Sequence, residues 1–423
     1  MLVSCGLPRC EVGHMQVFER LIDYAEAERL VLENSPPLPA EERPLLEAQG
    51  LALAEDVRAV FDSPPFDNSA VDGYALRSAD AVPGRTFRVV DEAPAGRPAR
   101  RGVGEGEAVK IFTGGVIPEG ADAVVMMENT SGWGEEFELG KEASPGQNIR
   151  RRGEDVREGE VILRAGTEVG PYEIALAAAQ GYGALPVRRR ARVVVLSTGT
   201  ELVEPGRRAL SPGEIYDSNS YALVAQAREA GAEARRLYAA ADDPGAIREA
   251  VAGALESADV VVTSGGVSVG EKDLVRSAMR ELGVEQVFWG VRFKPGKPLF
   301  FGARRDARCF GLPGNPVSAM VCFELFVRPA LMRMMGRVDR RRPRVRVRFG
   351  EDVKNRFGRM HAVRVALERT GEGWTARSVG SQGSGIISSL TRADAIALIG
   401  PGAEVKAGEE VEAILLREPR GGW

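Results

Sequence analysis

The chain has 423 residues, enough for about three domains, and its formal net charge of −4 gives no indication of nucleic acid or an anionic membrane as a partner. No apolar run approaches the roughly 20 residues that a membrane-spanning helix needs, and the first residues lack the basic and apolar regions of a secretory signal. The four scattered cysteines fit a reducing compartment, so we expect a cytoplasmic protein.

Two kinds of pattern follow one another in the first half of the chain. Residues 15–32 space their apolar side chains as one face of an amphipathic helix, and residues 171–180 are expected to form a second, short helix. Between them, alternating runs at 85–90, 107–111 and 123–127, separated by Gly and Pro, indicate a small β-rich domain.

Three polar positions in this half are candidates for function. Asp72 precedes Gly73 among turn-forming residues, so we expect a tight loop, which an ordinary Asp-Gly turn would explain equally well. Thr113 ends an apolar run and precedes two glycines. Asp155 follows an arginine run that is typical of a solvated loop, and none of the three indicates a site by itself.

From about residue 192 to residue 336 strands alternate with helices, which predicts a parallel α/β sheet with covering helices. Ligands bind outside the carboxyl ends of such strands, and glycine there lets a backbone approach a ligand closely. Three predicted strand ends carry small residues that leave space for a phosphate: Ser197, Thr198 and Gly199; Ser264, Gly265 and Gly266; and Pro313, Gly314 and Asn315.

Asp273 follows the middle strand end, close to the next helix, where a carboxylate suits a phosphate with a divalent cation. The spacing of Gly265 and Gly270 near Lys272 resembles a P-loop. A P-loop needs Gly-Lys-Ser/Thr, however, and here Glu271 intervenes and Asp273 takes the place of the hydroxyl. A structural turn between strand and helix remains the alternative at this point.

The basic residues single out a second segment, KPGK, which contains Lys294 and Lys297. Among 56 basic residues only seven are lysines, so two of them three positions apart stand out. A compact ammonium on a flexible stem can follow a phosphate as it changes shape, which a planar guanidinium does less readily. Because the chain has only two histidines, carboxylates, lysines and metal must carry any reaction.

The last residues alternate without a helical pattern, contain Gly383-Ser384-Gly385 and are expected to form a small β-barrel after an arginine-rich linker. The fold class is therefore multidomain α/β. We predict four domains: a discontinuous N-terminal domain (15–45 and 150–188), a β-rich domain (46–149), an α/β domain (189–336) and a C-terminal β-barrel domain (337–423).

Eight motifs occur in a fixed order: FDNSAVDGYA, IFTGGVIPEGADAVV, NIRRRGEDV, LSTGTEL, EIYDSNS, TSGGVSVGEKD, FKPGKP and GLPGNPVSA. Together they resemble the molybdopterin molybdenumtransferase family, known as MoeA and as the E domain of gephyrin, from about residue 15 to the C-terminus. The resemblance implies a homodimer whose subunits have four domains. It also implies a reaction, the insertion of molybdate into adenylylated molybdopterin with release of AMP and dependence on Mg²⁺.

The resemblance also implies roles for individual residues. Glu201 and Asp273 match metal-site carboxylates, which are hard oxygen ligands for Mg²⁺. The other functional residues that it implies are the acids Asp72, Asp155 and Asp242, the donor Thr113, the basic pair Lys294 and Lys297, and Arg364 and Ser384 for holding molybdate. The chain departs from the pattern at Gly290, where some relatives have lysine, and at His361, where an acidic residue is usual.

Two other functions stay open from the sequence. The adenylylation of molybdopterin is the preceding step, but its enzymes resemble the α/β domain alone, and that adenylyltransferase is also a candidate partner. The second alternative is a non-catalytic scaffold, against which the intact set of carboxylates and lysines argues.

Overall fold

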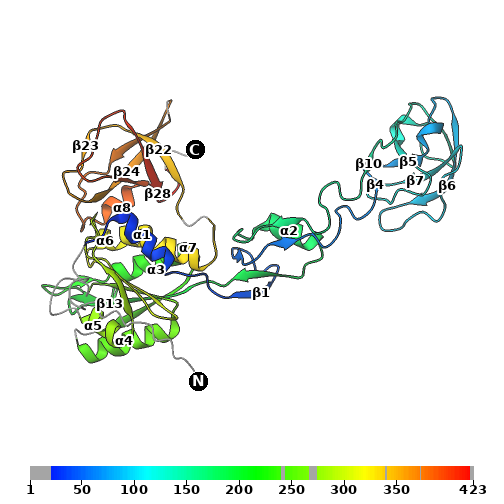
Figure 1. Ribbon diagram of the computed structural model, residues 1–423. Coiled ribbons are helices and arrows are strands. Elements are labelled where there is room, and N and C mark those ends of the chain that lie inside the picture. The colour runs from blue at the N-terminus through cyan, green and yellow to red at the C-terminus, as the bar shows by residue number, and fades with distance from the viewer. Residues whose placement is uncertain (1–20, 240–242, 266–273, 339–340, 372, 420–423) are drawn as a thin grey trace, which may run out of the picture. The chain divides into compact units, whose positions relative to one another are not determined.

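The computed structural model describes residues 21–239, 243–265, 274–338, 341–371 and 373–419 (Figure 1). The chain divides into two compact units. Unit 1 comprises the N-terminal residues up to Glu41, Gly50–Ala54 and everything from Val187 onwards, and unit 2 comprises Glu42–Gln49 and Glu55–Pro186. Within the described ranges, no helix combines the length and hydropathy that crossing a membrane would require.

A six-stranded sheet in the order β16-β13-β17-β21-β20-β18 lies at the centre of unit 1. The first four strands of that order are parallel, as expected, whereas β20 pairs antiparallel with both β21 and β18 and so runs opposite to the other strands, a direction that the apolar pattern does not encode. The strands are β13 (Arg192–Thr198), β16 (Glu233–Ala239), β17 (Val260–Ser264), β18 (Glu285–Trp289), β20 (Phe300–Ala303) and β21 (Arg308–Leu312).

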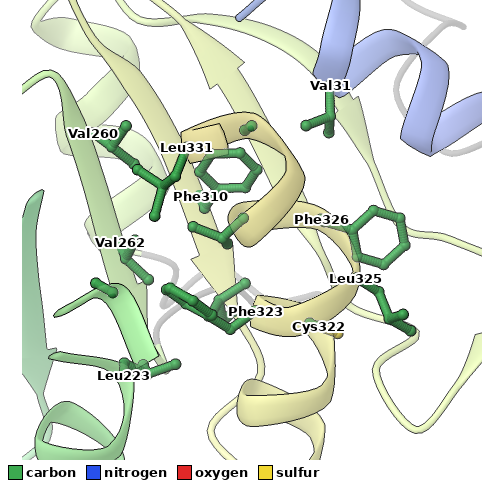
Figure 2. Packing of buried hydrophobic residues seen from close by; sticks show 14 of the residues in the cluster. Val31, Leu223, Val260, Val262, Phe310, Cys322, Phe323, Leu325, Phe326 and Leu331 are labelled. Atoms are coloured by element: carbon green, nitrogen blue, oxygen red, sulfur yellow. The ribbon is translucent and has the colours of Figure 1, made fainter. Parts of the chain in front are cut away.

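Helices cover both faces of this sheet because successive strand residues point to opposite sides. Val260 and Val262 belong to the cluster that contains residues of α1, α3, α6 and α7 (Figure 2), whereas Val261 packs with residues of α4 and α5. The helices are α1 (Tyr24–Glu33), α3 (Asn219–Glu229), α4 (Pro244–Ser257), α5 (Leu274–Glu281), α6 (Pro316–Cys322) and α7 (Arg328–Met334), with a π-helical turn, η3 (Phe323–Val327), between the last two.

The start of the first helix differs from the prediction. The helix was expected from residue 15, but α1 begins at Tyr24, and Ile22 instead forms a parallel bridge with Val291. Asp23, at the N-cap position, pairs with Arg292 through Oδ1 and Oδ2, at 2.8 and 2.9 Å. The apolar residues before Tyr24 therefore contact an extended segment, which helical spacing cannot reveal, and residues 15–20 lie outside the described ranges.

The C-terminal segment of unit 1 forms a closed barrel, which confirms that prediction. Strands β24, β25, β22, β28 and β26 follow one another, and β26 pairs again with β24 to close the ring. A short helix, α8 (Ser388–Arg392), lies in this segment, for which no helix was expected. The strands are β22 (Arg344–Phe349), β24 (Met360–Thr370), β25 (Gly373–Ser378), β26 (Ala395–Ile399) and β28 (Glu410–Leu415), with a short pair of β23 (Val353–Lys354) and β27 (Glu404–Val405).

One further strand joins the barrel from a distant part of the chain. The two-residue strand β19 (Phe293–Lys294) lies in the sequence of the α/β segment but pairs in parallel with β24, Phe293 with Met360 and Lys294 with His361. The KPGK segment is therefore fixed to the barrel.

Unit 2 contains a five-stranded sheet in the order β8-β5-β7-β6-β9. Tyr74 packs on one face of the sheet and Ala75 on the other, with separate apolar clusters on each side. The three predicted runs are confirmed as the strands β6, β7 and β8. The strands of the sheet are β5 (Gly73–Leu76), β6 (Thr86–Ala93), β7 (Glu107–Ile111), β8 (Ala123–Met126) and β9 (Glu136–Glu138).

The remaining elements are short. The second predicted helix is confirmed as α2 (Pro171–Ala179). The short strands are β1 (Ala40–Pro44), β2 (Ala52–Leu53), β3 (Val57–Arg58), β4 (Asn68–Ser69), β10 (Ile149–Arg150), β11 (Val161–Leu163), β12 (Ala184–Arg188), β14 (Leu202–Val203) and β15 (Ile215–Tyr216), and the 3₁₀ turns are η1 (Ser78–Asp80) and η2 (Met127–Asn129).

Candidate functional site

The three predicted strand ends meet at one edge of the unit 1 sheet. The Gly265 N–H donates to the Leu312 carbonyl at 3.1 Å, which joins the ends of β17 and β21. A Cβ on Gly265 would lie 3.7 Å from the Thr198 carbonyl oxygen, and a Cβ on Gly314 would lie 3.8 Å from the Gly265 Cα. With φ of +86° at Gly265, this position favours glycine, and without a Cβ the Gly265 backbone is open to a close approach.

Asn219, the first residue of α3, holds this edge together. Its Nδ2 donates to the Ser264 hydroxyl at 2.8 Å and to the Gly314 carbonyl at 2.7 Å. Its Oδ1 is buried and has no partner among the described residues, and the same is true of the Ser197 hydroxyl. Buried polar atoms are rarely left unpaired, which makes these two oxygens candidates for a contact with a ligand.

Glu201 places a carboxylate at the end of β13. It is exposed, and its oxygens fold back on Gly199 so closely that a Cβ there would lie 2.7 Å from Oε2. Glycine at this position, with φ of +147°, therefore makes room for the carboxylate. Pro313 and Asn315 lie on the neighbouring loop after β21, where Asn315 occupies the N-cap position of α6 without a side-chain cap bond.

Three predicted residues, Gly266, Asp242 and Asp273, lie outside the described ranges. Among the residues that the structure does describe, no group of three or more His, Cys, Asp or Glu side chains could hold a metal ion. One exposed carboxylate at a phosphate-sized edge still fits Mg²⁺, which commonly binds one or two carboxylates together with substrate phosphates. The metal role of Glu201 and Asp273 stays a prediction.

The KPGK turn lies between the barrel and α6. Gly296, with φ of +119°, is so close to α6 that a Cβ would lie 2.3 Å from the Cys322 sulfur. On one side of it Lys297 is exposed, and on the other Lys294 lies with its Nζ 3.3 Å from the centroid of the Phe357 ring. Burial, together with the charges of nearby arginines, lowers the pKa of the Lys294 ammonium.

Arg364 on β24 is fully buried yet only partly satisfied. Its Nη2 donates to the Gly383 carbonyl at 3.3 Å, whereas Nε and Nη1 have no partner among the described residues. Burial lowers the pKa of Arg364 to about 10, so the guanidinium still carries its charge at neutral pH. The Ser384 carbonyl accepts the Val317 N–H of α6 at 3.0 Å, which brings this loop to the α/β part of the unit. Two unused donors on a buried cation fit an oxyanion.

The two departures from the expected pattern have structural counterparts. Gly290 has φ of +83°, and a Cβ there would lie 2.5 Å from Leu21 Cδ2, so a lysine would not fit without a shift of the chain. His361 is buried, and neither ring nitrogen has a hydrogen-bond partner in the described part of the chain. Burial and the charges of Lys294 and Arg364 lower its pKa to about 4, so the imidazole is neutral at neutral pH.

Within unit 2, the structure brings Asp72 and Thr113 together. The Thr113 backbone N–H and hydroxyl both donate to Asp72 Oδ1, at 2.7 and 2.8 Å, and these two bonds lower the pKa of the Asp72 carboxyl. Asp72 lies on a loop directly before β5, as predicted. The pair therefore presents an ionised carboxylate at an exposed position.

Asp155 is also exposed, and its backbone N–H donates to the Ser63 carbonyl at 3.0 Å. The arginines before it are not simply a solvated run, because Arg151 pairs with Asp67 and Arg152 with Asp62, each at 2.6 Å. Asp155 lies in a loop that is fixed by these ion pairs, and its function stays a prediction.

Three family models match consecutive parts of the chain. They are the MoeA N-terminal region (domain I and II) over residues 22–181, a probable molybdopterin binding domain over 194–333, and the MoeA C-terminal region (domain IV) over 346–416. A molybdopterin molybdenumtransferase of Haemophilus influenzae is 37% identical over 399 residues, covering 92% of this chain and 98% of that protein. This chain belongs to the MoeA, or molybdopterin molybdenumtransferase, family.

Other MoeA relatives agree. Molybdopterin molybdenumtransferase 2 of Mycobacterium tuberculosis is 41% identical over 313 residues, covering 71% of this chain and 76% of that protein. The crystal structure of a molybdopterin biosynthesis MoeA protein from Pyrococcus horikoshii matches with a TM-score of 0.81 and 33% identity, covering 96% of this chain and all of that one.

Two residues of this MoeA site, Asn219 and Phe357, were not predicted from the sequence. Asn219 lies inside the quoted motif EIYDSNS, and an asparagine at the start of a helix beside glycine-rich strand ends is the signal that could have indicated it. No sequence pattern indicated Phe357, because its contact with Lys294 joins segments that are far apart in the chain.

Proposed function

We propose that this chain inserts molybdate into adenylylated molybdopterin and releases AMP, with Mg²⁺ at the glycine-rich strand ends. The observation that carries the proposal is Arg364, a fully buried guanidinium with two unused N–H donors in a chain of the MoeA family. Such a group is costly to bury alone and becomes favourable when an oxyanion accepts from it. The expected cytoplasmic location belongs to the same proposal.

The strand ends suit the diphosphate of the adenylylated substrate. The open backbone at Gly265 and Gly314 lets phosphate oxygens approach, and the unpaired Ser197 hydroxyl supplies a donor. Asn219 keeps the two strand ends at a fixed separation. Glu201 and the substrate phosphates would hold Mg²⁺, and the ion would supply positive charge at the P–O–P linkage, where cleavage of one P–O bond releases AMP.

The basic side chains suit molybdate. Arg364 offers Nε and Nη1 to an oxyanion, while Lys294 and Lys297 carry charge on either side of the tight turn at Gly296. Lys297 is exposed and can meet an oxyanion from solvent, whereas Lys294 is half-buried and held. The residues therefore divide into one group that captures the anion and one that fixes it.

Asp72 and Thr113 belong to unit 2, and we propose that the enzyme is a homodimer in which one subunit supplies them to the partner's site. The family resemblance supports the dimer, and the ionised Asp72 carboxylate suits an N–H donor of the pterin or adenine ring. Mixing Asp72→Ala and Lys294→Ala chains tests this arrangement. Activity regained in mixed dimers supports sharing, and inactive mixed dimers refute it.

AMP release from adenylylated molybdopterin, measured with and without molybdate and Mg²⁺, tests the reaction. We expect release that depends on both ions and is lost in Arg364→Met. The matched control is Arg348→Met, which removes a partly exposed barrel arginine that pairs with Glu410, and should behave as wild type. Release without molybdate, or formation of the adenylylated pterin from ATP instead, would overturn the proposal. No observation favours the adenylyltransferase or the scaffold.

A further inference from the structure

Lys294 lacks the partner that its position would lead one to expect. It lies in register with His361 across the β19–β24 pairing, where the family resemblance implies an acidic residue. His361 cannot neutralise an ammonium, and no carboxylate of the described residues forms an ion pair with Nζ. A positive charge that is partly buried without an anion needs another source of stabilisation.

The Phe357 ring provides it. Lys294 Nζ lies 3.3 Å from the ring centroid, well inside the roughly 6 Å over which a ring face attracts a cation. This is the shortest distance between a cation and a ring in the described part of the chain, where the others run from 3.7 to 6.0 Å.

A buried asparagine holds the turn that carries Phe357. Asn355, which is 1% exposed, donates through Nδ2 to the carbonyls of Arg359, Ile399 and Gly400, and its Oδ1 accepts the Phe357 N–H at 3.1 Å. The His361 ring meets Phe357 edge-on, with centroids 5.7 Å apart. The turn before β24 is therefore held by a buried side chain that fixes the Phe357 backbone, and the phenyl ring, which is 37% exposed, packs against His361 on one side.

We propose that Phe357 is a positioning residue for Lys294, which holds the ammonium in place without neutralising it. A carboxylate at this position would compete with an incoming oxyanion for the charge, whereas a ring face attracts the cation and leaves its full charge available. The identification of the oxyanion as molybdate rests on the proposed function. The contact between lysine and ring does not depend on it.

Lysine NMR tests the contact by itself. The chain has seven lysines, so selective ¹³C labelling gives a small set of Cε signals, and Lys294→Arg identifies the signal of Lys294. An ammonium over a ring face has an upfield ring-current shift at Cε. We expect this shift to vanish in Phe357→Leu and to persist in Phe357→Tyr. An unshifted Lys294 signal in the wild-type protein would overturn the inference, whatever the reaction is.

The molybdate requirement tests the consequence. We expect Phe357→Leu to raise the molybdate concentration for half-maximal AMP release about 2- to 30-fold, with AMP affinity unchanged and Phe357→Tyr close to wild type. The control is Trp374→Leu, which removes another cation–ring pair of the same barrel, with Arg369 at 6.0 Å, and should leave the requirement unchanged. A Leu variant that matches wild type refutes the inference while leaving the proposed reaction intact.

A double substitution separates positioning from general damage. His361→Asp places a carboxylate in register with Lys294, so adding Phe357→Leu to it should raise the molybdate requirement little further. If the two effects are instead independent, Phe357 does not act through Lys294. If AMP release by the wild-type protein does not depend on molybdate, the proposed function is wrong. The NMR result still shows whether Lys294 contacts Phe357.

Discussion

Gly296→Ala is predicted to be the most damaging single-methyl change in the KPGK turn. The new Cβ would lie 2.3 Å from the Cys322 sulfur, and φ at this position is +119°. Forcing a methyl into a packed site costs about 1–3 kcal/mol, and left-handed backbone adds roughly 1–2 kcal/mol for an L-residue. We therefore expect a loss of about 2–5 kcal/mol in the unfolding free energy of unit 1, measured by equilibrium unfolding in urea.

Two further variants separate the two contributions. Gly283 also has a positive φ, +82°, but nothing lies within 4 Å of its Cβ position, so Gly283→Ala should cost only the backbone part, about 1–2 kcal/mol. In a Cys322→Ala background, which removes the sulfur, Gly296→Ala should cost less than in wild type. If Gly296→Ala costs no more than Gly283→Ala, the clash with α6 does not hold this turn in place.

Three other predictions concern charged groups. Burial alone would raise the pKa of Asp259, but bonds from Arg189 and Arg192 lower it to about 2, so this carboxylate stabilises the fold above pH 3.8 and loses that effect as pH falls towards 2. The destabilisation by Asp259→Asn should therefore shrink by about 2 kcal/mol over that range in urea unfolding, and a pH-independent difference would contradict this. Thr113→Val removes one of two donors to Asp72, so NMR titration should show the Asp72 pKa rising towards its ordinary value, and an unchanged pKa would argue that the backbone bond suffices. Arg364→Met should leave the unfolding free energy unchanged or higher without ligand while molybdate use is lost, whereas a large loss of stability would mean that the guanidinium serves the fold.

Parts of the site could be predicted where local sequence decides the geometry. Parallel strands end at the same edge of a sheet, so glycines after β13, β17 and β21 had to meet, and the contact of Gly265 with the Leu312 carbonyl follows from this rule. Asp72 before Gly73 likewise had to occupy a loop. The position of such residues is determined by the few residues next to them in the sequence.

Other parts depend on partners far along the chain. A two-residue strand such as β19 has no periodicity, so its pairing with His361 could not be read from the sequence. The contact of Lys294 with Phe357 follows from that pairing. The helix start at Tyr24 was missed for the same reason, because Ile22 pairs with Val291 instead of continuing the helix.

The pairing of β19 with β24 also has a consequence for the order in which a newly made chain can mature. A ribosome delivers the strands of the α/β sheet by Leu312, so that sheet can assemble while the barrel is still unmade. The KPGK turn gains its contact with the barrel only after Met360 and His361 emerge, and the barrel closes only when β28 arrives near the end of synthesis. A chain that ends before β24 can thus contain a folded sheet whose KPGK turn is not attached to a barrel. The pairing of β19 with β24 therefore distinguishes a complete molecule from a truncated one.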